Sequence, residues 1–414
     1  MYATGLICRE CGTTYDAEAR YACDVCFGPL EVHYDLEAAK GAVTRESIEA
    51  GPASIWRYRA LLPDPGESPV DLGAGWTPLR HAPRLAAELG LADLWLKDDT
   101  RNPTGSFKDR VVSVALSVAR RLGFTTAACA STGNLATSVA AHAAAIGWPS
   151  VTIIPFDLET SKVAMTAVFG GTVLGVRGNY DDVNRLCVEL VAEHPDWAFA
   201  NVNLRPYYAE GSKTLAFEIA EQLGWRTPDQ VVVPVASGSQ LTKVAKGFRE
   251  FRALGLVDGP DPVLFGAQAT GCSPIATAFA NGSDVITPQR PDTIARSLAI
   301  GNPADGPYVL DELRRHGGDC GSVSDGEILE GISLLARTEG VFAETAGGVT
   351  IASLRQMVER GTIDRTKTTV AIISGHGLKT LDAVVDQATH TAVISPGLAD
   401  AEEALRFTQL VAAS

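Results

Sequence analysis

A lysine directly after a turn of small and polar residues is the first feature of this sequence that could do chemistry. Lys108 follows the run Asn-Pro-Thr-Gly-Ser-Phe at 102–107. A lysine amine held beside an aldehyde can form a Schiff base, and once released it can move protons as a general base. The alternative is a surface lysine in the first turn of a helix, with Thr104 or Ser106 as the N-cap.

Three further motifs follow apolar runs and could bind a ligand. A turn of small residues between a strand and a helix presents backbone N–H groups to an anion, although a plain connecting turn would look the same. A serine or threonine there can also simply cap the helix, and a serine at a strand end can simply bond nearby backbone. The motifs are Ser131-Thr132-Gly133-Asn134 after residues 126–130, Ala236-Ser237-Gly238-Ser239-Gln240 after residues 231–235, and Ser374-Gly375-His376-Gly377 at the end of residues 369–374.

Two cysteine pairs near the N-terminus predict a structural zinc site. A CxxC pair can place two thiolates on one turn, and two such pairs complete a tetrahedral site. Four free thiols or two disulfides are the alternatives, and the segment has too few basic residues to favour a nucleic-acid-binding ribbon. The expected ligands are Cys8, Cys11, Cys23 and Cys26.

The composition is that of an ordinary soluble enzyme. Of 414 residues, 46% are hydrophobic and 20% charged, and the formal net charge is −14. This charge argues against broad binding to nucleic acid or to an anionic membrane, because both require clustered cations. No apolar run reaches the about 20 residues that cross a bilayer. The first residues lack a basic region followed by a long apolar stretch, so a cytoplasmic location is expected.

Strand and helix patterns alternate along most of the chain, which is typical of parallel α/β architecture. Continuous Val and Ile runs suit strands that are buried on both faces. Pro234 weakens one of these strands, because proline cannot donate to a ladder. The expected strands are residues 94–97, 126–130, 150–155, 172–176, 231–235, 264–268 and 369–374. The expected helices are residues 111–122, 134–146, 161–169 and 180–194.

The order and spacing of the motifs resemble the threonine synthase family, within the fold-type II pyridoxal phosphate (PLP) enzymes. The similarity runs from Cys8 to about Lys379. Besides the motifs above, it includes Gly-Trp-Thr-Pro-Leu at 75–79, Asn-Val-Asn at 201–203, Glu-Gly-Ser-Lys-Thr at 210–214, Gly-Asn-Pro at 301–303 and Gly-His-Gly-Leu-Lys at 375–379.

The resemblance implies a fold similar to the tryptophan synthase β chain. Two parallel-sheet domains with helices on both faces would follow a small zinc-ribbon-like segment. The implied division is residues 1–45 for that segment, 46–400 for the PLP-dependent core with a smaller domain inserted at about 112–205, and 401–414 for a tail. A homodimer is implied by analogy alone.

The resemblance also implies a role for each motif. Lys108 would carry PLP as a Schiff base and then act as the base at Cα and Cβ. Residues Ala236, Ser237, Gly238, Ser239 and Gln240 would cup the PLP phosphate, and Asn134 would bond the phenolic oxygen. Ser131, Thr132 and Gly133 would hold the substrate carboxylate. Ser374 would bond the pyridine nitrogen, and such a neutral partner suits elimination and replacement better than transamination.

The sequence departs from the family pattern where the substrate phosphate is expected. The family often has an arginine where this chain has Tyr208. A dianionic phosphate normally needs cationic donors, so Arg205 or Lys213 is expected to replace that arginine. The phosphate cup and residues 344–348 also differ from the pattern.

The resemblance therefore predicts conversion of O-phospho-L-homoserine and water to L-threonine and phosphate. The nearest rival is a PLP enzyme for β-replacement or β-elimination on another O-activated amino acid, such as O-phosphoserine in a cysteate synthase-like reaction. A serine or threonine deaminase fits less well with the cysteine pairs. A binding protein that kept the fold and lost the chemistry is at odds with the intact Lys108 and Asn134.

Overall fold

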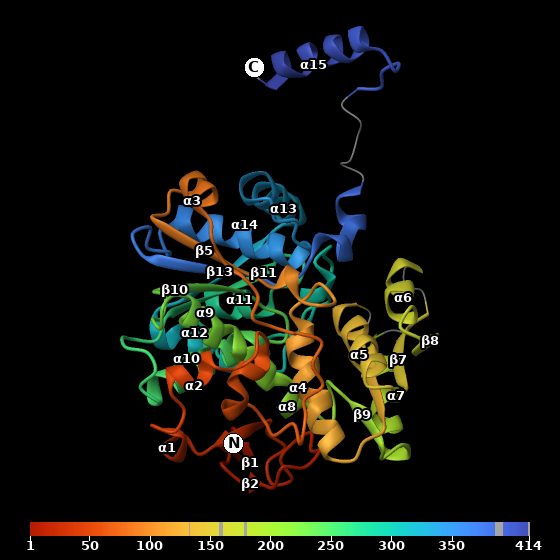
Figure 1. The fold of residues 1–414 in the computed structure, drawn as a ribbon, viewed down its shortest axis with the longest axis vertical. Coiled ribbons are helices and arrows are strands. Elements are labelled where there is room, and N and C mark those ends of the chain that lie inside the picture. Colours follow the sequence, from red (N-terminus) through yellow and green to blue (C-terminus); the bar gives the residue numbers. More distant parts are fainter. Residues whose placement is uncertain (132, 157–159, 178–179, 386–391, 413–414) are drawn as a thin grey trace. The chain divides into compact units, whose positions relative to one another are not determined.

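The computed structural model describes residues 1–131, 133–156, 160–177, 180–385 and 392–412. The chain forms two compact units, residues 1–379 and 380–414. The second unit holds most of the helical segment η5 (Gly377–Ala383) and the helix α15 (Leu398–Ala412). All motifs singled out from the sequence lie in the first unit, whose elements appear in Figure 1.

The N-terminal segment is a small antiparallel sheet with the strand order β2-β1-β3. Its first strand contains Gly5, where an added Cβ would lie 2.3 Å from the carbonyl oxygen of Tyr15, so the neighbouring strand passes too close for any side chain. The strands are β1 (Ala3–Cys8), β2 (Thr14–Tyr15) and β3 (Leu30–Tyr34). The helices that follow are α1 (Leu36–Ala39), α2 (Arg45–Glu49) and the 3-10 helix η1 (Ile55–Leu61).

A six-stranded sheet in the order β12-β11-β10-β13-β5-β4 forms the centre of the molecule. All its neighbours are parallel except β4, which runs antiparallel to β5. Pro234 is tolerated because it is the last residue of β10 and pairs only toward β11. The strands are β4 (Leu79–His81), β5 (Asp93–Asp98), β10 (Gln230–Pro234), β11 (Val263–Ala269), β12 (Asp319–Val323) and β13 (Thr368–Ile373).

Helices cover both faces of this sheet. Figure 1 shows α13 and α14 on one side of the strands and α10 and α12 on the other. The expectation of parallel sheets with helices on both faces is thus confirmed. The helices around the sheet are α3 (Pro83–Leu89), α9 (Thr214–Gln222), α10 (Ser239–Ala253), α11 (Pro274–Ala280), η4 (Arg296–Leu298), α12 (Gly306–His316), α13 (Asp325–Glu339) and α14 (Thr345–Arg360).

A second, fully parallel sheet has the order β8-β7-β6-β9. Its central strand β6 is completely buried, as its run of small apolar residues predicts. The expected domain boundaries stay predictions. The strands are β6 (Thr126–Ala130), β7 (Ser150–Pro155), β8 (Thr172–Val176) and β9 (Trp197–Phe199), and the associated helices are α5 (Asn134–Ala145), α6 (Thr160–Ala167) and α7 (Tyr180–Glu193).

A buried ion network at the end of β5 fixes the start of α4 (Lys108–Arg121). The guanidinium of Arg110 donates to Asp99 at 2.7 and 2.8 Å and to both carboxylate oxygens of Glu218. Glu218 also pairs with Lys97 at 2.6 Å, and none of these four side chains is exposed. Asp99 belongs to the 3-10 helix η2 (Asp99–Arg101), which directly follows β5 with Lys97, so the network joins three separate stretches of chain: residues 97–99, Arg110 and Glu218.

Among the described residues, no helix combines the length and the apolar character needed to cross a membrane.

We expect Glu218→Gln to destabilise the protein by about 3–5 kcal/mol, because breaking a buried ion pair leaves uncompensated charge. Burial alone would raise the pKa of Glu218, but Arg110 and Lys97 lower it to about 2. A depressed pKa stabilises the fold above the unfolded value of about 4.3, and this stabilisation is lost as the pH falls toward 2. Urea denaturation from pH 3 to 7 should therefore show a weaker acid dependence in the variant.

The matched control is Glu189→Gln, which removes an exposed carboxylate paired with Arg185. It should change stability by less than about 0.5 kcal/mol. Equal effects of the two substitutions would contradict the importance of the buried network.

Candidate active site

Lys108 is the first residue of α4 and lies against the end of β13. The amide of Phe107 donates to the carbonyl of Ser374 at 2.8 Å, and Ser106 bridges to Gly375. The amine of Lys108 is half-buried and donates to the hydroxyl of Tyr208 at 2.9 Å. Lys108 is therefore held inside the first unit and is not the surface lysine of the alternative interpretation.

Asn134 and Ser374, which the resemblance assigns to two different atoms of one ligand, meet on a single carboxylate. Glu344 accepts from the side-chain amide of Asn134 at 2.8 Å and from the hydroxyl of Ser374 at 3.1 Å. Only 2% of Glu344 is exposed, and an added Cβ at Gly375 would lie 2.5 Å from its carboxylate. The β13 end, the start of α5 and the start of α14 thus converge at this point.

Burial raises the pKa of Glu344, while the bond from Asn134 and the nearby Lys379 oppose that shift. Burial likewise lowers the pKa of Lys379, whose side chain lies beside Gly105. Sequence reasoning missed Glu344: residues 344–348 stood out only as a departure from the family pattern. Glu344 is the N-cap residue of α14 but makes no capping hydrogen bond, and no local pattern places its carboxylate beside Asn134.

The turn from Ala236 to Gln240 lies between β10 and the N-terminus of α10. Gly238 has a φ of +98°, and an added Cβ would lie 2.6 Å from Val309 and 3.1 Å from Asp305. No side chain caps the helix at Gly238. Within the described chain, Nε2 of Gln240 is buried without a hydrogen-bond partner.

The segment before α5 has a similar form. Gly133 is the N-cap of α5, and no side chain caps the helix there. The amide of Gly133 donates to the hydroxyl of Ser131 at 3.4 Å. Thr132 lies outside the described residues. The backbone N–H groups in the first turn of a helix can donate to a carboxylate.

The two cations expected to bind the substrate phosphate have different surroundings. Arg205, the first residue of α8 (Arg205–Glu210), pairs with Asp305 at 2.9 Å and keeps 24% of its side chain exposed. The amide of Asp305 in turn donates to the carbonyl of Ser237, so Arg205 belongs to the surroundings of the turn at 236–240.

Lys213 lies in the helical segment η3 (Gly211–Lys213) and has no exposed side-chain surface. Its amine pairs with Glu210 at 2.8 Å and with Glu250 at 2.9 Å. This buried pairing leaves the amine no direction toward a substrate, so the geometry does not support the role expected for Lys213.

The residues around Lys108 fit PLP. The segment 236–240 contains the start of α10, which no side chain caps, so its backbone N–H groups can donate to a phosphate. The side-chain amide of Gln240 also lacks a hydrogen-bond acceptor among the described residues, since its Nε2 is buried without a partner. Lys108 offers an amine, and Asn134 and Ser374 offer polar side chains that meet at the end of β13.

The N-terminal cysteines fit a metal ion. All four sulfur atoms lie within 4.8 Å of one another, and none of the cysteines forms a disulfide. Cys8 and Cys26 approach to 3.5 Å, and Cys11 and Cys23 to 3.6 Å. A tetrahedral zinc with bonds of about 2.3 Å separates its sulfurs by about 3.8 Å. The cluster therefore has the geometry that the CxxC spacing predicts.

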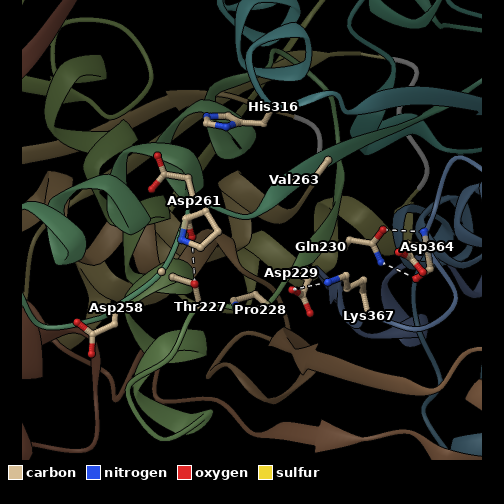
Figure 2. Close-up of a pocket in the computed structure, with 12 residues that line it drawn as sticks. Thr227, Pro228, Asp229, Gln230, Asp258, Asp261, Val263, His316, Asp364 and Lys367 are labelled. Atoms are coloured by element: carbon tan, nitrogen blue, oxygen red, sulfur yellow. Dashed lines mark hydrogen bonds and ion pairs between the residues drawn. The ribbon is translucent and has the colours of Figure 1, made fainter.

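A cavity of about 560 Å³ lies elsewhere, at the amino-terminal ends of β10, β11 and β13. Figure 2 shows its polar side chains bonded to one another: Gln230 with the backbone of Asp364, and Asp229 with Lys367. Lys108 and its neighbours lie beyond the opposite, carboxyl-terminal ends of the strands. This is the edge where ligands bind in open parallel sheets, so the cavity is not the candidate active site.

The chain belongs to the pyridoxal-phosphate dependent enzymes, because residues 70–375 match the family model of that description. It is 41% identical to the threonine synthase of Methanocaldococcus jannaschii, over 91% of this chain and 93% of that protein. It is 40% identical to the threonine synthase of Methanosarcina acetivorans, over 97% of this chain and 98% of that protein. Within these enzymes the chain is a member of the threonine synthase family, as its motifs predicted.

Solved structures agree on the fold. Maize serine racemase has a TM-score of 0.62 at 22% identity, covering 75% of this chain and 92% of that one. Threonine deaminase isoform 2 from Solanum lycopersicum has a TM-score of 0.64 at 19% identity, covering 94% and 93%. The expected fold-type II architecture is confirmed, and family membership makes the chain a PLP-dependent lyase.

We expect the purified protein to contain about one zinc ion per chain, because structural sites of this type hold a single tetrahedral ion. Cys11→Ser should lower the zinc content below half, as measured by elemental mass spectrometry after dialysis. Cys272→Ser, which alters a buried cysteine outside the cluster, should leave the zinc content unchanged. A wild-type protein without metal would contradict the zinc assignment.

Glu344→Gln should weaken PLP binding about tenfold, the equivalent of one hydrogen bond to a charged group. A neutral amide can no longer accept from Asn134 and Ser374 through two carboxylate oxygens. Absorbance titration of the PLP-free protein measures this affinity. Glu330→Gln, at an exposed pair with Arg355, is the control, and an affinity unchanged in both variants would show that Glu344 does not support the cofactor residues.

Proposed function

We propose that this protein converts O-phospho-L-homoserine and water to L-threonine and phosphate. The observation that carries the proposal is the half-buried Lys108 amine beside Asn134, Glu344 and Ser374, in a chain similar to threonine synthases over nearly its whole length. PLP, when bound, supplies the electron sink that makes the protons on the neighbouring substrate carbons acidic.

Lys108 is the group that binds PLP and then carries protons at Cα and Cβ. Its position at the start of α4 is fixed from both sides, by the Phe107–Ser374 hydrogen bond and by the Arg110 network. A base must lie within hydrogen-bond reach of the proton it removes, so this rigid placement serves the chemistry directly.

The two helix starts are assigned to the two anions. The turn of Ala236, Ser237, Gly238, Ser239 and Gln240 holds the PLP phosphate, where the N-terminus of α10 adds its positive dipole end. Ser131, Thr132 and Gly133 hold the substrate carboxylate at the start of α5. Asn134 and Ser374 orient the cofactor ring, and Glu344 holds both side chains in place.

Arg205 is assigned to the substrate phosphate. Asp305 occupies only part of its guanidinium, which has five donors, and the side chain keeps some exposure. The small phosphorylated amino acid is the only partner that the net charge of −14 and this site suggest. A cytoplasmic homodimer remains the expectation from the resemblance, and a monomer mass by light scattering would overturn the dimer.

A second candidate is replacement or elimination on O-phosphoserine. The observation that favours it is Tyr208, which stands at Lys108 where the family pattern often has an arginine. The shorter substrate would place its phosphate one bond closer to the lysine.

The test is phosphate release from both substrates by purified, PLP-loaded protein, with analysis of the amino-acid product. We expect phosphate and threonine from O-phosphohomoserine and at least tenfold slower release from O-phosphoserine. Lys108→Ala should lose the visible absorbance of the bound cofactor and all measurable turnover. Release from O-phosphoserine alone would replace the proposed function by the second candidate.

A further inference from the structure

We propose that Tyr208 is the acid that protonates the leaving phosphate, with Lys108 returning the proton to it. This proposal rests on the proposed function and assigns a further catalytic residue to that site. Its basis is the bond from the Lys108 amine to the Tyr208 hydroxyl and the position of Arg205 on the same helix.

The first observation is the hydrogen bond between the Lys108 amine and the hydroxyl of Tyr208. The distance between Lys108 Nζ and Tyr208 Oη is 2.9 Å, and within the described part of the chain this is the hydroxyl's only hydrogen bond. The amine also lies 5.5 Å from the centre of the Tyr208 ring. A phenol both accepts and donates, so it can take a proton from an ammonium while giving its own proton to another acceptor.

The second observation is that the side chains on the different faces of α8 have different surroundings. Arg205 and Tyr208 are three residues apart and therefore share one face of the helix. The neighbouring Tyr207 is buried, and its hydroxyl donates to the carbonyl of Glu18 in the N-terminal segment. Glu210 lies in the buried network with Lys213 and Lys243. One face of α8 thus carries a partly exposed cation and a phenol, while the others are committed to packing.

The third point is the separation between the substrate carbons that lose protons and the ester oxygen that must gain one. Lys108 must move protons at Cα and Cβ, but the ester oxygen of the substrate lies two bonds beyond Cβ. A single amine cannot serve both ends without moving. The phenol extends the proton path from Nζ by 2.9 Å, toward the face of α8 where Arg205 is assigned to the phosphate.

The step is balanced in protons and electrons. The electron pair that the departing Cβ proton leaves behind forms a second bond between Cβ and Cγ. The bond between Cγ and the ester oxygen breaks, and its electron pair goes to the oxygen, which takes the phenolic proton of Tyr208. The phenolic oxygen takes a proton from the Lys108 ammonium, which had received it from a substrate carbon. The lysine ends as a neutral amine, and the phenol is restored without becoming a free phenolate.

This assignment gives a chemical reason for the tyrosine at position 208, which differs from the family pattern. Where the family pattern often has an arginine, this chain has a proton donor, and the cation lies one helical turn earlier at Arg205. Charge binding and proton delivery are then carried by two residues.

The test separates proton removal at Cα from departure of phosphate. Phosphate release is measured with O-phosphohomoserine. Exchange of the Cα proton into D2O is measured by NMR with the phosphonate analogue, in which a CH2 group replaces the ester oxygen so that nothing can leave. The variants are Tyr208→Phe, Tyr208→Gln and, as the matched control on the same helix, Tyr207→Phe.

We expect phosphate release by Tyr208→Phe to fall at least about 100-fold, the lower range for loss of a general acid. Cα exchange and the visible spectrum of the PLP-loaded protein should change less than about threefold, because Lys108 is intact. Tyr208→Gln keeps a hydrogen-bond partner for Lys108 but has no acidic proton, so its phosphate release should be as slow. Tyr207→Phe should keep both rates.

Three results would overturn the proposal: phosphate release by Tyr208→Phe within tenfold of wild type, a parallel loss of Cα exchange, or rescue by Tyr208→Gln. The latter two would make the phenol a positioning group for Lys108. Melting temperature and PLP absorbance report folding in each variant, and Tyr208→Gln decides if Tyr208→Phe does not fold. A wild-type protein that exchanges the Cα proton but releases no phosphate would instead overturn the proposed function itself.

Discussion

The burial of Arg110 sets the arrangement of the segments around Lys108. A guanidinium without solvent exposure is tolerated only when carboxylates surround it, and Asp99 and Glu218 do so here. Although burial opposes it, these two carboxylates raise the pKa of Arg110, which stays charged. Glu218 also accepts from the amides of Trp76 and Thr77, so its place is fixed by backbone as well. Because Arg110 lies two residues after Lys108, the network sets where the reactive amine lies.

In the candidate active site, a buried carboxylate again holds the side chains around it, but its partners are uncharged. Glu344 is nearly as buried as the network carboxylates, but its hydrogen-bond donors are the neutral Asn134 and Ser374. Burial raises the pKa of such a carboxyl, and it lowers the pKa of Lys379 nearby. The same low-dielectric surroundings hold the groups in place and strengthen every charge interaction of a bound ligand.

The N-terminal segment is tied to the core by charges. Glu31 of β3 pairs with Lys243 of α10 at 2.8 Å, and Glu210 of α8 accepts from the same lysine at 2.7 Å. Arg9, which stands between two of the cluster cysteines, pairs with Asp305 at 3.3 Å and stacks on Tyr308. Because the amide of Asp305 also donates to the carbonyl of Ser237, the cysteine cluster and the turn before α10 share one set of contacts.

Local patterns in the amino-acid sequence were enough to predict the class of fold and the approximate position of the candidate site. Buried parallel strands are continuous apolar runs, which is why residues 126–130, 231–235 and 369–374 were recognised as strands. The small-residue turn at Gly238 and the cysteine spacing are equally local signals. The strand at 319–323 and the helices of the last third were not predicted, since β12 mixes polar and small residues within its five positions.

Only the tertiary structure decided which polar side chains face one another. Lys108 and Lys213 are the same residue type after similar small-residue segments, yet one amine meets a phenol and the other two carboxylates. Glu344 and Tyr208 lie 210 and 100 residues from the side chains they bond, Asn134 and Lys108. No local pattern encodes such pairings, because they arise from the packing of separate helices onto two sheets. The motifs located the carboxyl-terminal end of the strands where Lys108 lies, and the packing selected which side chains meet there.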